Sequence, residues 1–214
     1  MATPSPLQSA DTAPTRRTQE QRSAEMRNRL LDATVESLID RGYARTTTTV
    51  VCDRAGVSRG AQVHHFGTKA ELVIAAVTHL ARKQEVELRR QADSVLCAED
   101  RTARLVDAIV EIYASPLFYA ALELWVAART DADLLASLLE FERVVGKKLG
   151  EVWQEFGGDT AEAPDFDSII ELTMHLARGM ALQKILRSDD RSRHKLLEMW
   201  KAMAKQALRA DITH

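Results

Sequence analysis

Side chains that can hydrogen-bond to nucleic acid are concentrated in one short stretch of the chain, between Thr47 and Lys69. The guanidinium of Arg59 can take guanine O6 and N7 together, and the amide of Gln62 can pair in a similar way with adenine. Arg59 suits a phosphate equally well, because many protein–DNA hydrogen bonds go to the backbone. The other donors are candidates for phosphate contacts: Thr47, Thr49, Ser58, His64, His65 and Lys69. These residue types predict contacts to double-stranded DNA.

Small residues and paired histidines in the same stretch narrow the chemistry further. Gly60 and Ala61 carry little bulk, so the backbone there can approach a DNA surface closely. His64 and His65 are adjacent, but neighbours on a helix point about 100° apart, so one metal ion cannot easily take both. We therefore predict no metal site and no cofactor.

Start and stop signals of short helices surround these side chains. A hydroxyl of Thr46 or Thr47 can cap a first helix, and Gly56 ends it where the chain needs a positive φ. Ser58 can cap a second helix. Residues 68–71 have the Ser/Thr-x-x-Glu spacing of a capping box and begin a long third one. This order is typical of a helix-turn-helix, whose second helix enters the major groove.

The stretch from Arg29 to Leu72 resembles the TetR family of bacterial transcriptional regulators. The residues that carry the resemblance are Leu31, Ala33, Thr34, Leu38, Gly42, Tyr43, Thr46, Thr47, Val51, Cys52, Ala55, Gly56, Val57, Ser58, Arg59, Gly60, His65, Phe66, Lys69 and Leu72. The chain departs from the family at Gln62, Val63 and His64, where an aliphatic residue and aromatics are usual; Val63 either packs on a thymine methyl or fills the core. The resemblance implies a dimeric all-α repressor, with an N-terminal DNA-binding domain and a larger C-terminal domain that binds a small effector.

Composition agrees with a helical protein that has a sizeable core. The chain has 214 residues, of which 45% are hydrophobic and only 5% aromatic, and this favours helices over a β-sandwich. No apolar run reaches the ~18 residues of a membrane span. Residues 1–22 lack the apolar segment of a secretory signal and are expected to form a disordered arm. Cys52 and Cys97 have no metal or redox spacing. We expect a cytoplasmic protein, associated with the nucleoid when bound to DNA, and no membrane partner.

Charge divides the chain unequally. Residues 16–69 hold ten Lys and Arg against six Asp and Glu, whereas residues 96–214 hold fifteen against twenty. The basic end coincides with the proposed DNA reader, although a solvated helix face alone produces a similar bias. We expect a three-helix DNA-binding domain at residues 23–68 and a ligand-binding and dimerisation domain at residues 69–214. Its helices are expected at residues 69–91, 101–114, 117–130, 132–156, 167–187 and 191–209, the first of which links the two domains.

An apolar stripe with aromatic side chains in the larger domain is a candidate site for a small, largely apolar effector. Arg129 lies one turn after Trp125 and is a candidate partner for a carboxylate. Residues of these types also fill ordinary cores, so the stripe alone does not separate a pocket from a core. The candidate ligand contacts are Tyr113, Phe118, Leu122, Trp125, Arg129, Met174 and His175.

Two further stripes, at residues 169–184 and 196–208, suit a four-helix interface between two copies of the chain. Gly179 would permit close approach of the two helices. The alternative is that these stripes pack only on their own domain. The candidate dimer contacts are Ile170, Thr173, Ala177, Met180, Trp200, Met203 and Ala207.

Together these features predict a homodimeric repressor that leaves a palindromic operator when a small effector shifts helices 101–114 and 69–91. The alternative is a helical protein–protein adaptor that has lost sequence-specific DNA binding, since the usual aromatics of the reader helix are absent. An enzyme is not expected, because the sequence contains no Walker A, Gly-x-Ser-x-Gly, His-Glu-x-x-His or Cys-x-x-Cys motif.

Overall fold

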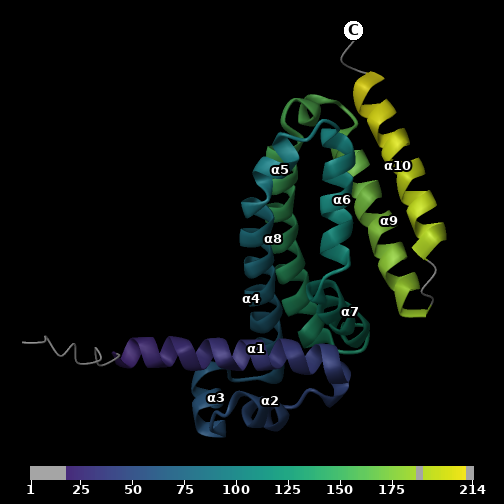
Figure 1. Ribbon diagram of the computed structural model, residues 1–214. Helices are drawn as coiled ribbons and strands as arrows, with labels where there is room; N and C mark the ends of the chain where they lie inside the picture. Colours follow the sequence, from purple (N-terminus) through teal and green to yellow (C-terminus); the bar gives the residue numbers. More distant parts are fainter. Residues whose placement is uncertain (1–17, 187–189, 211–214) are drawn as a thin grey trace, which may run out of the picture.

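The computed structural model describes residues 18–186 and 190–210, and this part of the chain folds entirely into helices and short connections (Figure 1). The expected all-α class is confirmed. The elements are α1 (Gln19–Arg45), α2 (Thr48–Ala55), α3 (Arg59–His65), α4 (Lys69–Arg90), α5 (Ala92–Leu96), α6 (Arg101–Tyr113), α7 (Pro116–Ala128), α8 (Ala132–Gly157), the 3-10 helix η1 (Gly158–Glu162), α9 (Phe166–Leu186) and α10 (Asp190–Ala210).

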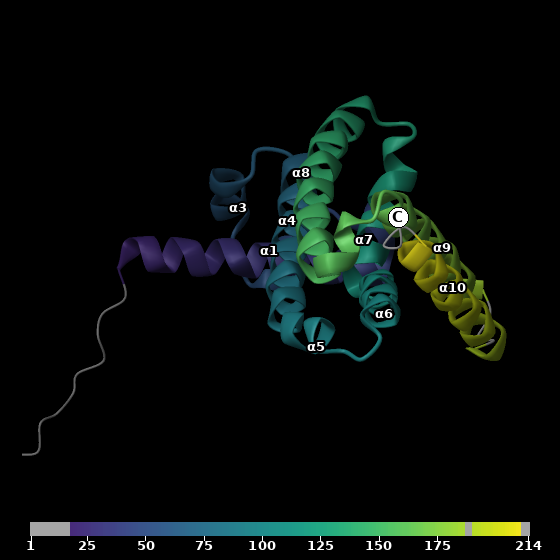
Figure 2. The same ribbon diagram turned by 90° about the horizontal axis from the view of Figure 1, so that it is seen from above.

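The first helix begins earlier than the sequence suggested. Thr18 caps α1 through a reciprocal capping box: its hydroxyl accepts the backbone N–H of Gln21, and the Gln21 side chain accepts the N–H of Thr18. The prediction of a disordered arm at residues 1–22 is therefore wrong for residues 18–22, while residues 1–17 lie outside the described residues. The first turns of α1 project beyond the rest of the fold in both views (Figure 2).

The N-terminal helices form a small core that continues into α4. Leu30 and Leu31 of α1 pack with Val51 of α2 and with Phe66, directly after α3. Leu72 of α4 belongs to the same cluster. The hydrophobic core of the DNA-binding domain therefore extends past the expected boundary at residue 68, and the linking helix α4 is part of both domains.

The larger domain stands on α1 as a group of upright helices (Figure 1). One buried cluster joins α1 and α4 to α7 and α8, through residues such as Leu38, Leu124 and Phe141. A second joins α6 and α8 to α9 and α10, around Ile109 and Phe156. The helices α9 and α10 form one flank of the molecule in both views (Figure 2).

Helix boundaries in the larger domain follow the signals in the sequence. Pro116 occupies the first turn of α7, where its missing N–H has no intrahelical partner to lose. Asp131 caps α8 by accepting the N–H of Leu134. The short helix α5 was not expected. No single helix of the described ranges is long and apolar enough to span a membrane; only α6 and α7 taken together, with a 57° bend between them, have the required length and composition.

Candidate nucleic-acid interface and ligand cavity

Local hydrogen bonds hold the two reader helices, α2 and α3, at a fixed angle. Thr47 caps α2 and Ser58 caps α3, each hydroxyl accepting a backbone N–H of the first turn. Gly56 ends α2 with φ = 61°, a left-handed conformation that favours glycine. Arg29 of α1 donates to the carbonyl oxygens of Ala55 and Gly56, so the guanidinium takes up carbonyls that the end of α2 leaves free.

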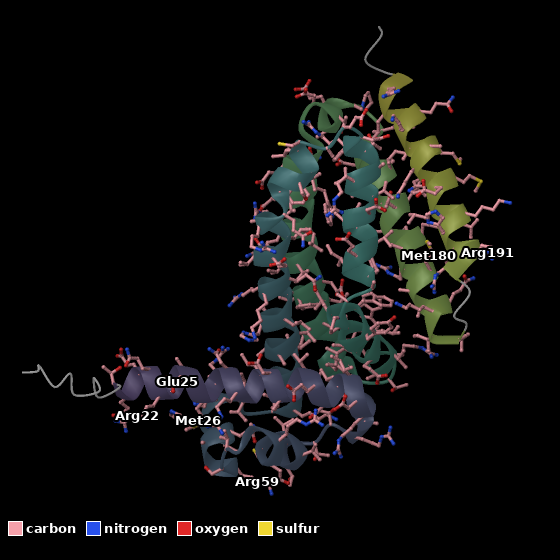
Figure 3. All side chains as sticks on the ribbon, in the orientation of Figure 1. Arg22, Glu25, Met26, Arg59, Met180 and Arg191 are labelled. Atoms are coloured by element: carbon pink, nitrogen blue, oxygen red, sulfur yellow. The ribbon has the colours of Figure 1, made fainter. Side chains whose placement is uncertain are left out.

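The outer face of α3 presents its side chains to solvent. Arg59 and His64 are exposed, and Val63 is 62% exposed. Arg59 lies at the far end of the molecule, on the side away from the larger domain (Figure 3). Gly60 is exposed too, and a Cβ added there would meet no atom within 4 Å. Val63 therefore does not fill the core, and it belongs to the surface that the recognition helix offers to a major groove.

Thr47, Thr49 and Ser58 are exposed at the helix starts, where their hydroxyls can face phosphates. Ala61 and His65 are only partly exposed. The pKa of His65 lies below its ordinary value because the ring is partly buried and because His64 and Arg27 are close by. This shift favours the neutral ring, which has one N–H to donate.

Two of the predicted DNA contacts are occupied inside the protein. Gln62 is only 3% exposed, and its side-chain amide donates to the carbonyl of Phe66 at 2.7 Å. Lys69 donates to the carbonyl of Tyr43 at 2.7 Å, and its ammonium lies 3.8 Å from the centre of the Tyr43 ring. The prediction that Gln62 reads adenine is therefore corrected, because its side chain braces the helices behind the reader surface. Lys69 also braces them, but it is partly exposed, and its contact with a phosphate stays a prediction.

A cavity opens in the larger domain between α6, α7, α8 and α9. It holds about 80 Å³ of space that water can reach and is partly open to solvent, which is less than the usual volume of a preformed small-molecule pocket. Aromatic rings form much of the wall: Phe118 lies edge-on to Tyr113 at 5.4 Å and to Trp125 at 6.1 Å between ring centres. The remaining lining residues are Ile112, Leu117, Ala121, Phe141, Glu142, Val145, Leu149 and Arg178.

Three of the seven predicted ligand contacts line this cavity, namely Tyr113, Phe118 and Trp125. The other four lie outside the lining of this cavity. Leu122 is partly buried without lining the cavity, and Arg129 is exposed at the end of α7. Met174 packs against the core around Phe156, and His175 is exposed 3.7 Å from Glu171. The arginine at the cavity is Arg178, which the sequence did not single out.

Four predicted dimer contacts of α9 face inward. Ile170, Thr173, Ala177 and Met180 are all less than 10% exposed, because this stripe packs against the protein's own core. Trp200 of α10 also turns inward, where its indole N–H donates to the hydroxyl of Thr173 at 2.9 Å. The predicted dimer contacts are therefore corrected for the four buried residues of α9, while Trp200 is only partly buried and its contact with a second copy stays a prediction. Ala207 is partly buried, and only Met203, at 54% exposure, lies on the open face.

The open face of α9 and α10 is apolar at regular intervals. Its exposed hydrophobic side chains are Leu172, Leu182, Ile185, Leu186, Leu196, Met199 and Met203. Within α9, residues 172, 175, 179, 182 and 186 alternate steps of three and four, the spacing of a helix that packs along a neighbour. We call this surface the outer α9–α10 face.

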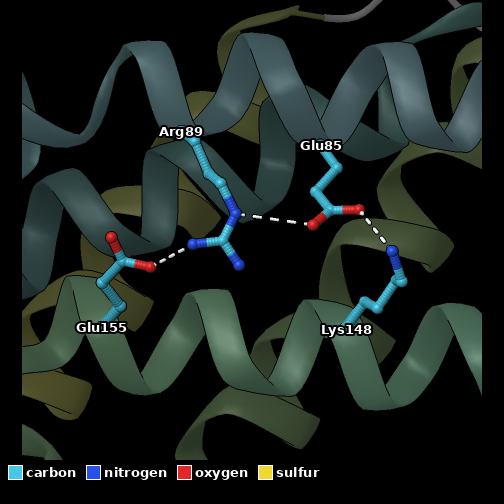
Figure 4. Close-up of polar contacts among 4 residues, drawn as sticks. All are labelled: Glu85, Arg89, Lys148 and Glu155. Atoms are coloured by element: carbon cyan, nitrogen blue, oxygen red, sulfur yellow. Dashed lines mark hydrogen bonds and ion pairs between the residues drawn. The ribbon is translucent and has the colours of Figure 1, made fainter.

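Polar contacts join the linking helix to the wall of the cavity. Glu85 of α4 accepts from Lys148 of α8 at 3.3 Å, and Arg89 of α4 pairs with Glu85 and with Glu155 of α8 (Figure 4). Such exposed pairs contribute little stability each. They connect α4 to α8. The helix α4 follows the reader helices, and α8 carries Phe141 and Glu142 of the cavity.

Comparison with known proteins identifies the family. The model for bacterial regulatory proteins of the tetR family matches residues 30–76. CymR of Pseudomonas putida, an HTH-type transcriptional regulator, is 30% identical over 195 residues, which cover 87% of this chain and 95% of CymR. The chain belongs to the TetR family. It is accordingly a DNA-binding transcriptional regulator and not an enzyme. An uncharacterized HTH-type regulator of Mycobacterium bovis is 29% identical over 78% of this chain and 86% of its own length.

Solved structures show the same fold. A transcriptional regulator from Pseudomonas aeruginosa PAO1 aligns with a TM-score of 0.64 at 22% identity, over 92% of this chain and 97% of that one. The multidrug binding protein EbrR, solved with imidazole, aligns with a TM-score of 0.57 at 19% identity, over 85% of this chain and 93% of EbrR. The TetR-family layout of an N-terminal helix-turn-helix and a helical C-terminal domain is thus confirmed.

The sequence reading of this TetR-family chain missed residues that act across elements. Arg178 follows the buried Ala177 on α9, and only the fold shows that its guanidinium reaches Tyr113 and Trp125. The sequence also does not decide whether Val63 lies in the core or on the surface. The one available signal was that Gln62 and Val63 cannot share a helix face, so a buried Gln62 places Val63 outside.

Proposed function

We propose that the chain is a homodimeric repressor that binds a two-fold DNA operator and leaves it when a small effector enters the cavity between α6, α7, α8 and α9. The observation that carries the proposal is the exposed face of α3, which presents Arg59, Gly60, Val63 and His64 to solvent. The guanidinium of Arg59 suits guanine. The bare backbone at Gly60 allows a phosphate to come close, and the apolar side chain of Val63 suits a thymine methyl. Such a regulator would act in the cytoplasm.

The outer α9–α10 face supports the dimer. Two readers must lie about 34–36 Å apart to meet successive major grooves on one side of B-DNA. A second copy packed on this face would bury side chains that otherwise stay in water, such as Leu186 at 84% exposure. Two helices from each copy would then form a four-helix interface.

The contacts of α1 favour α7 as the element that carries the effector signal. Phe118 and Trp125 of α7 line the cavity, and the carboxylate of Glu123, on the same helix, accepts the backbone N–H of Tyr43 at 2.9 Å. This bond lies next to Gly42, where α1 bends with φ = 73°. Since α1 packs on α2, α4 and α7, a displacement of α7 would move the reader. The expected coupling is about 1–3 kcal/mol, carried by α7 and α4 rather than by α6.

The direct test is a fluorescence-anisotropy titration of DNA that flanks the protein's own gene, at several salt concentrations. Wild type should bind selectively, with an affinity that falls as salt rises. Arg59→Ala should weaken binding by roughly 1–3 kcal/mol if the guanidinium reads a base. Arg129→Ala is the matched control, because that arginine is exposed in the larger domain, at the end of α7.

A selection of bound genomic fragments extends the test beyond the neighbouring DNA. Recovery of a palindromic sequence would support the repressor, and loss of its binding on addition of an effector would support the release mechanism. Wild type that binds no sequence selectively in this selection would contradict the proposal and favour a protein–protein adaptor.

A further inference from the structure

The cavity holds a cation that the protein leaves partly unpaired. Arg178 enters the wall from α9, and its closest polar neighbour is the Tyr113 hydroxyl, 3.4 Å from Nη2. Its Nε is buried and has no hydrogen-bond partner in the described ranges. Trp153 Nε1 is also buried and unpaired, but Trp153 does not line this cavity. Arg178 thus lines the cavity with a guanidinium whose hydrogen-bond donors are only partly paired.

An unpaired guanidinium in this position calls for an anion. Arginine stays protonated at any physiological pH, so it cannot escape the cost of burial by losing its charge. Its planar fork matches a carboxylate, which accepts two parallel N–H bonds. By contrast, Arg54 on the surface meets Asp40 at 2.9 Å, which is how this chain satisfies an arginine when a carboxylate is at hand.

The rest of the wall favours a flat apolar body attached to that anion. Tyr113, Phe118 and Trp125 stand edge-to-face with one another, an arrangement into which a further aromatic ring can stack. Leu117, Ala121 and Val145 complete an apolar surround. The wall therefore offers one guanidinium beside a surround that suits an aromatic ring.

The opposite charge, a cationic ligand held by Glu142, fits less well. Glu142 is the one carboxylate in the wall, and it already accepts the indole N–H of Trp125 at 2.6 Å. A ligand cation would also need the faces of the aromatic rings. Arg178 occupies that position, with its guanidinium carbon 4.9 Å from the Trp125 ring centre and 5.7 Å from that of Tyr113. A second cation beside it would be repelled.

We propose that the cavity binds an aromatic monocarboxylate, whose carboxylate accepts from Arg178 and whose ring lies among Tyr113, Phe118 and Trp125. This inference rests on the proposed function in one respect only, namely that an effector occupies this cavity. Arg178 belongs to α9 and the rings belong to α6 and α7. Such a ligand would therefore contact both α9, which is part of the outer α9–α10 face, and α7, which contacts α1.

The test compares ligands that differ only in charge. Benzoate and 1-naphthoate are titrated into the full-length protein by calorimetry at pH 7, beside their neutral amides and the corresponding arylmethylamines. The carboxylates should bind at least tenfold more tightly than the amides and amines. This comparison needs no variant, so it holds whatever a substitution does to folding. An amide or amine that binds as tightly as its acid, or acids that do not bind at all, would overturn the inference.

Variants then locate the bound carboxylate. Arg178→Gln should weaken the acid by roughly tenfold to a hundredfold, the value of hydrogen bonds to a charged group. Arg178→Lys keeps the charge without the fork and should fall between Gln and wild type. Arg129→Gln is the matched control and should bind like wild type. An acid that binds Arg178→Gln as well as wild type would place the carboxylate elsewhere and refute the assignment.

Failure of the inference and failure of the proposed function give different results. A neutral or cationic compound that binds in the cavity and releases the operator overturns the carboxylate and leaves the repressor standing. An acid that requires Arg178 but does not alter operator affinity supports the carboxylate and overturns the release mechanism. The two titrations, of ligand and of DNA, are therefore run on the same preparations.

Discussion

The two domains treat their arginines in opposite ways. In the DNA-binding domain, the guanidinium of Arg29 donates to the carbonyls of Ala55 and Gly56, and Arg59 is exposed to solvent. In the larger domain, Arg178 is drawn into an aromatic cavity and keeps a buried Nε without a partner. A satisfied arginine fixes structure, an exposed one is ready for a surface such as DNA, and a half-satisfied buried one indicates a ligand that is yet to bind.

The two domains differ in whether their binding site is fully formed before the partner binds. The reader surface is formed by short helices whose caps lie within a few residues of one another, so it is preformed before DNA arrives. The cavity is assembled from four helices, and the guanidinium of Arg178 in its wall keeps a buried Nε without a partner. Substitutions in the two domains should therefore differ in whether they change stability, DNA binding or ligand binding.

The largest effect on stability is expected in the core of the larger domain. Phe156 is fully buried, among residues such as Trp153 and Phe166. Phe156→Ala should lower the free energy of unfolding by about 3–5 kcal/mol, because it leaves a cavity. Arg59→Ala should change it by less than about 0.5 kcal/mol, since that side chain is exposed, while it weakens DNA binding. Chemical denaturation of both variants checks this, and a reversed order would place the stabilising core elsewhere.

The second effect compares two arginines directly. Arg29→Gln should destabilise the protein by about 1.5–3 kcal/mol, because carbonyls at the end of α2 lose a charged donor. Arg178→Gln, without ligand, should change stability by less than about 1 kcal/mol in either direction, because it removes a buried cation that is not paired. Thermal and chemical unfolding measure both. Equal losses would mean that Arg178 is a structural arginine like Arg29, and the contrast between the domains would fail.

The third effect concerns helical glycines that the fold does not require. A Cβ added to Gly60 of α3 or to Gly179 of α9 would meet no atom within 4 Å. Replacing either by alanine should therefore stabilise its helix by about 1 kcal/mol. The gain should be offset by a loss of function: Gly60→Ala should weaken operator binding, and Gly179→Ala should weaken the dimer.

Gly150 of α8 is the control for both glycine variants, since a Cβ there also meets open space and α8 is not part of the outer α9–α10 face. Gly150→Ala should give the same stabilisation without either loss. Anisotropy reports operator binding, and sedimentation velocity reports the dimer. A Gly179→Ala protein that dimerises as tightly as wild type would remove the close approach from the proposed interface.

These contrasts also explain which features the sequence could predict. The reader was predictable because its signals are local: Thr47 and Ser58 cap within three residues, and Gly56 marks the turn. Most helices of the larger domain were predictable for the same reason, through Asp131 and Pro116. The orientation of Gln62 was not, because its amide closes a bond to Phe66 that periodicity alone does not reveal.

The cavity and the dimer face were harder because they depend on which helix packs on which. The apolar stripe of α9 was visible, but a stripe buried in its own domain and one buried by a second copy have the same spacing. In the structure, Ile170 and Ala177 are buried in their own domain, whereas Leu172 and Leu186 are exposed, where the proposed second copy would cover them. The sequence analysis predicts Arg129 as the partner of a ligand carboxylate, whereas the arginine that lines the cavity is Arg178 of α9.

The smallest effect is a test of charge at the junction of α6 and α10. Asp100 caps α6 by accepting the N–H of Ala103 at 3.1 Å, and it pairs with Lys205 of α10. The hydrogen bond from Lys205 in particular, with that from Ala103, holds the pKa of Asp100 below its ordinary value. A carboxyl whose pKa is lower in the folded chain stabilises above its unfolded pKa of about 3.9, and the contribution disappears as the pH falls through the folded pKa.

Asp100→Asn keeps a capping side chain and removes only the charge. At pH 7 it should lower the free energy of unfolding by less than about 1 kcal/mol, because the pair is partly exposed. The difference from wild type should begin to shrink as the pH falls below about 4, where the unfolded wild type takes up a proton, and it should vanish once the pH lies below the lowered pKa of folded Asp100. Asp159→Asn, on an exposed turn, should match wild type throughout. Urea denaturation at pH 7 and pH 3 measures this, and a difference of the same size at both pH values would assign the effect to cap geometry, with no part for the ion pair between α6 and α10.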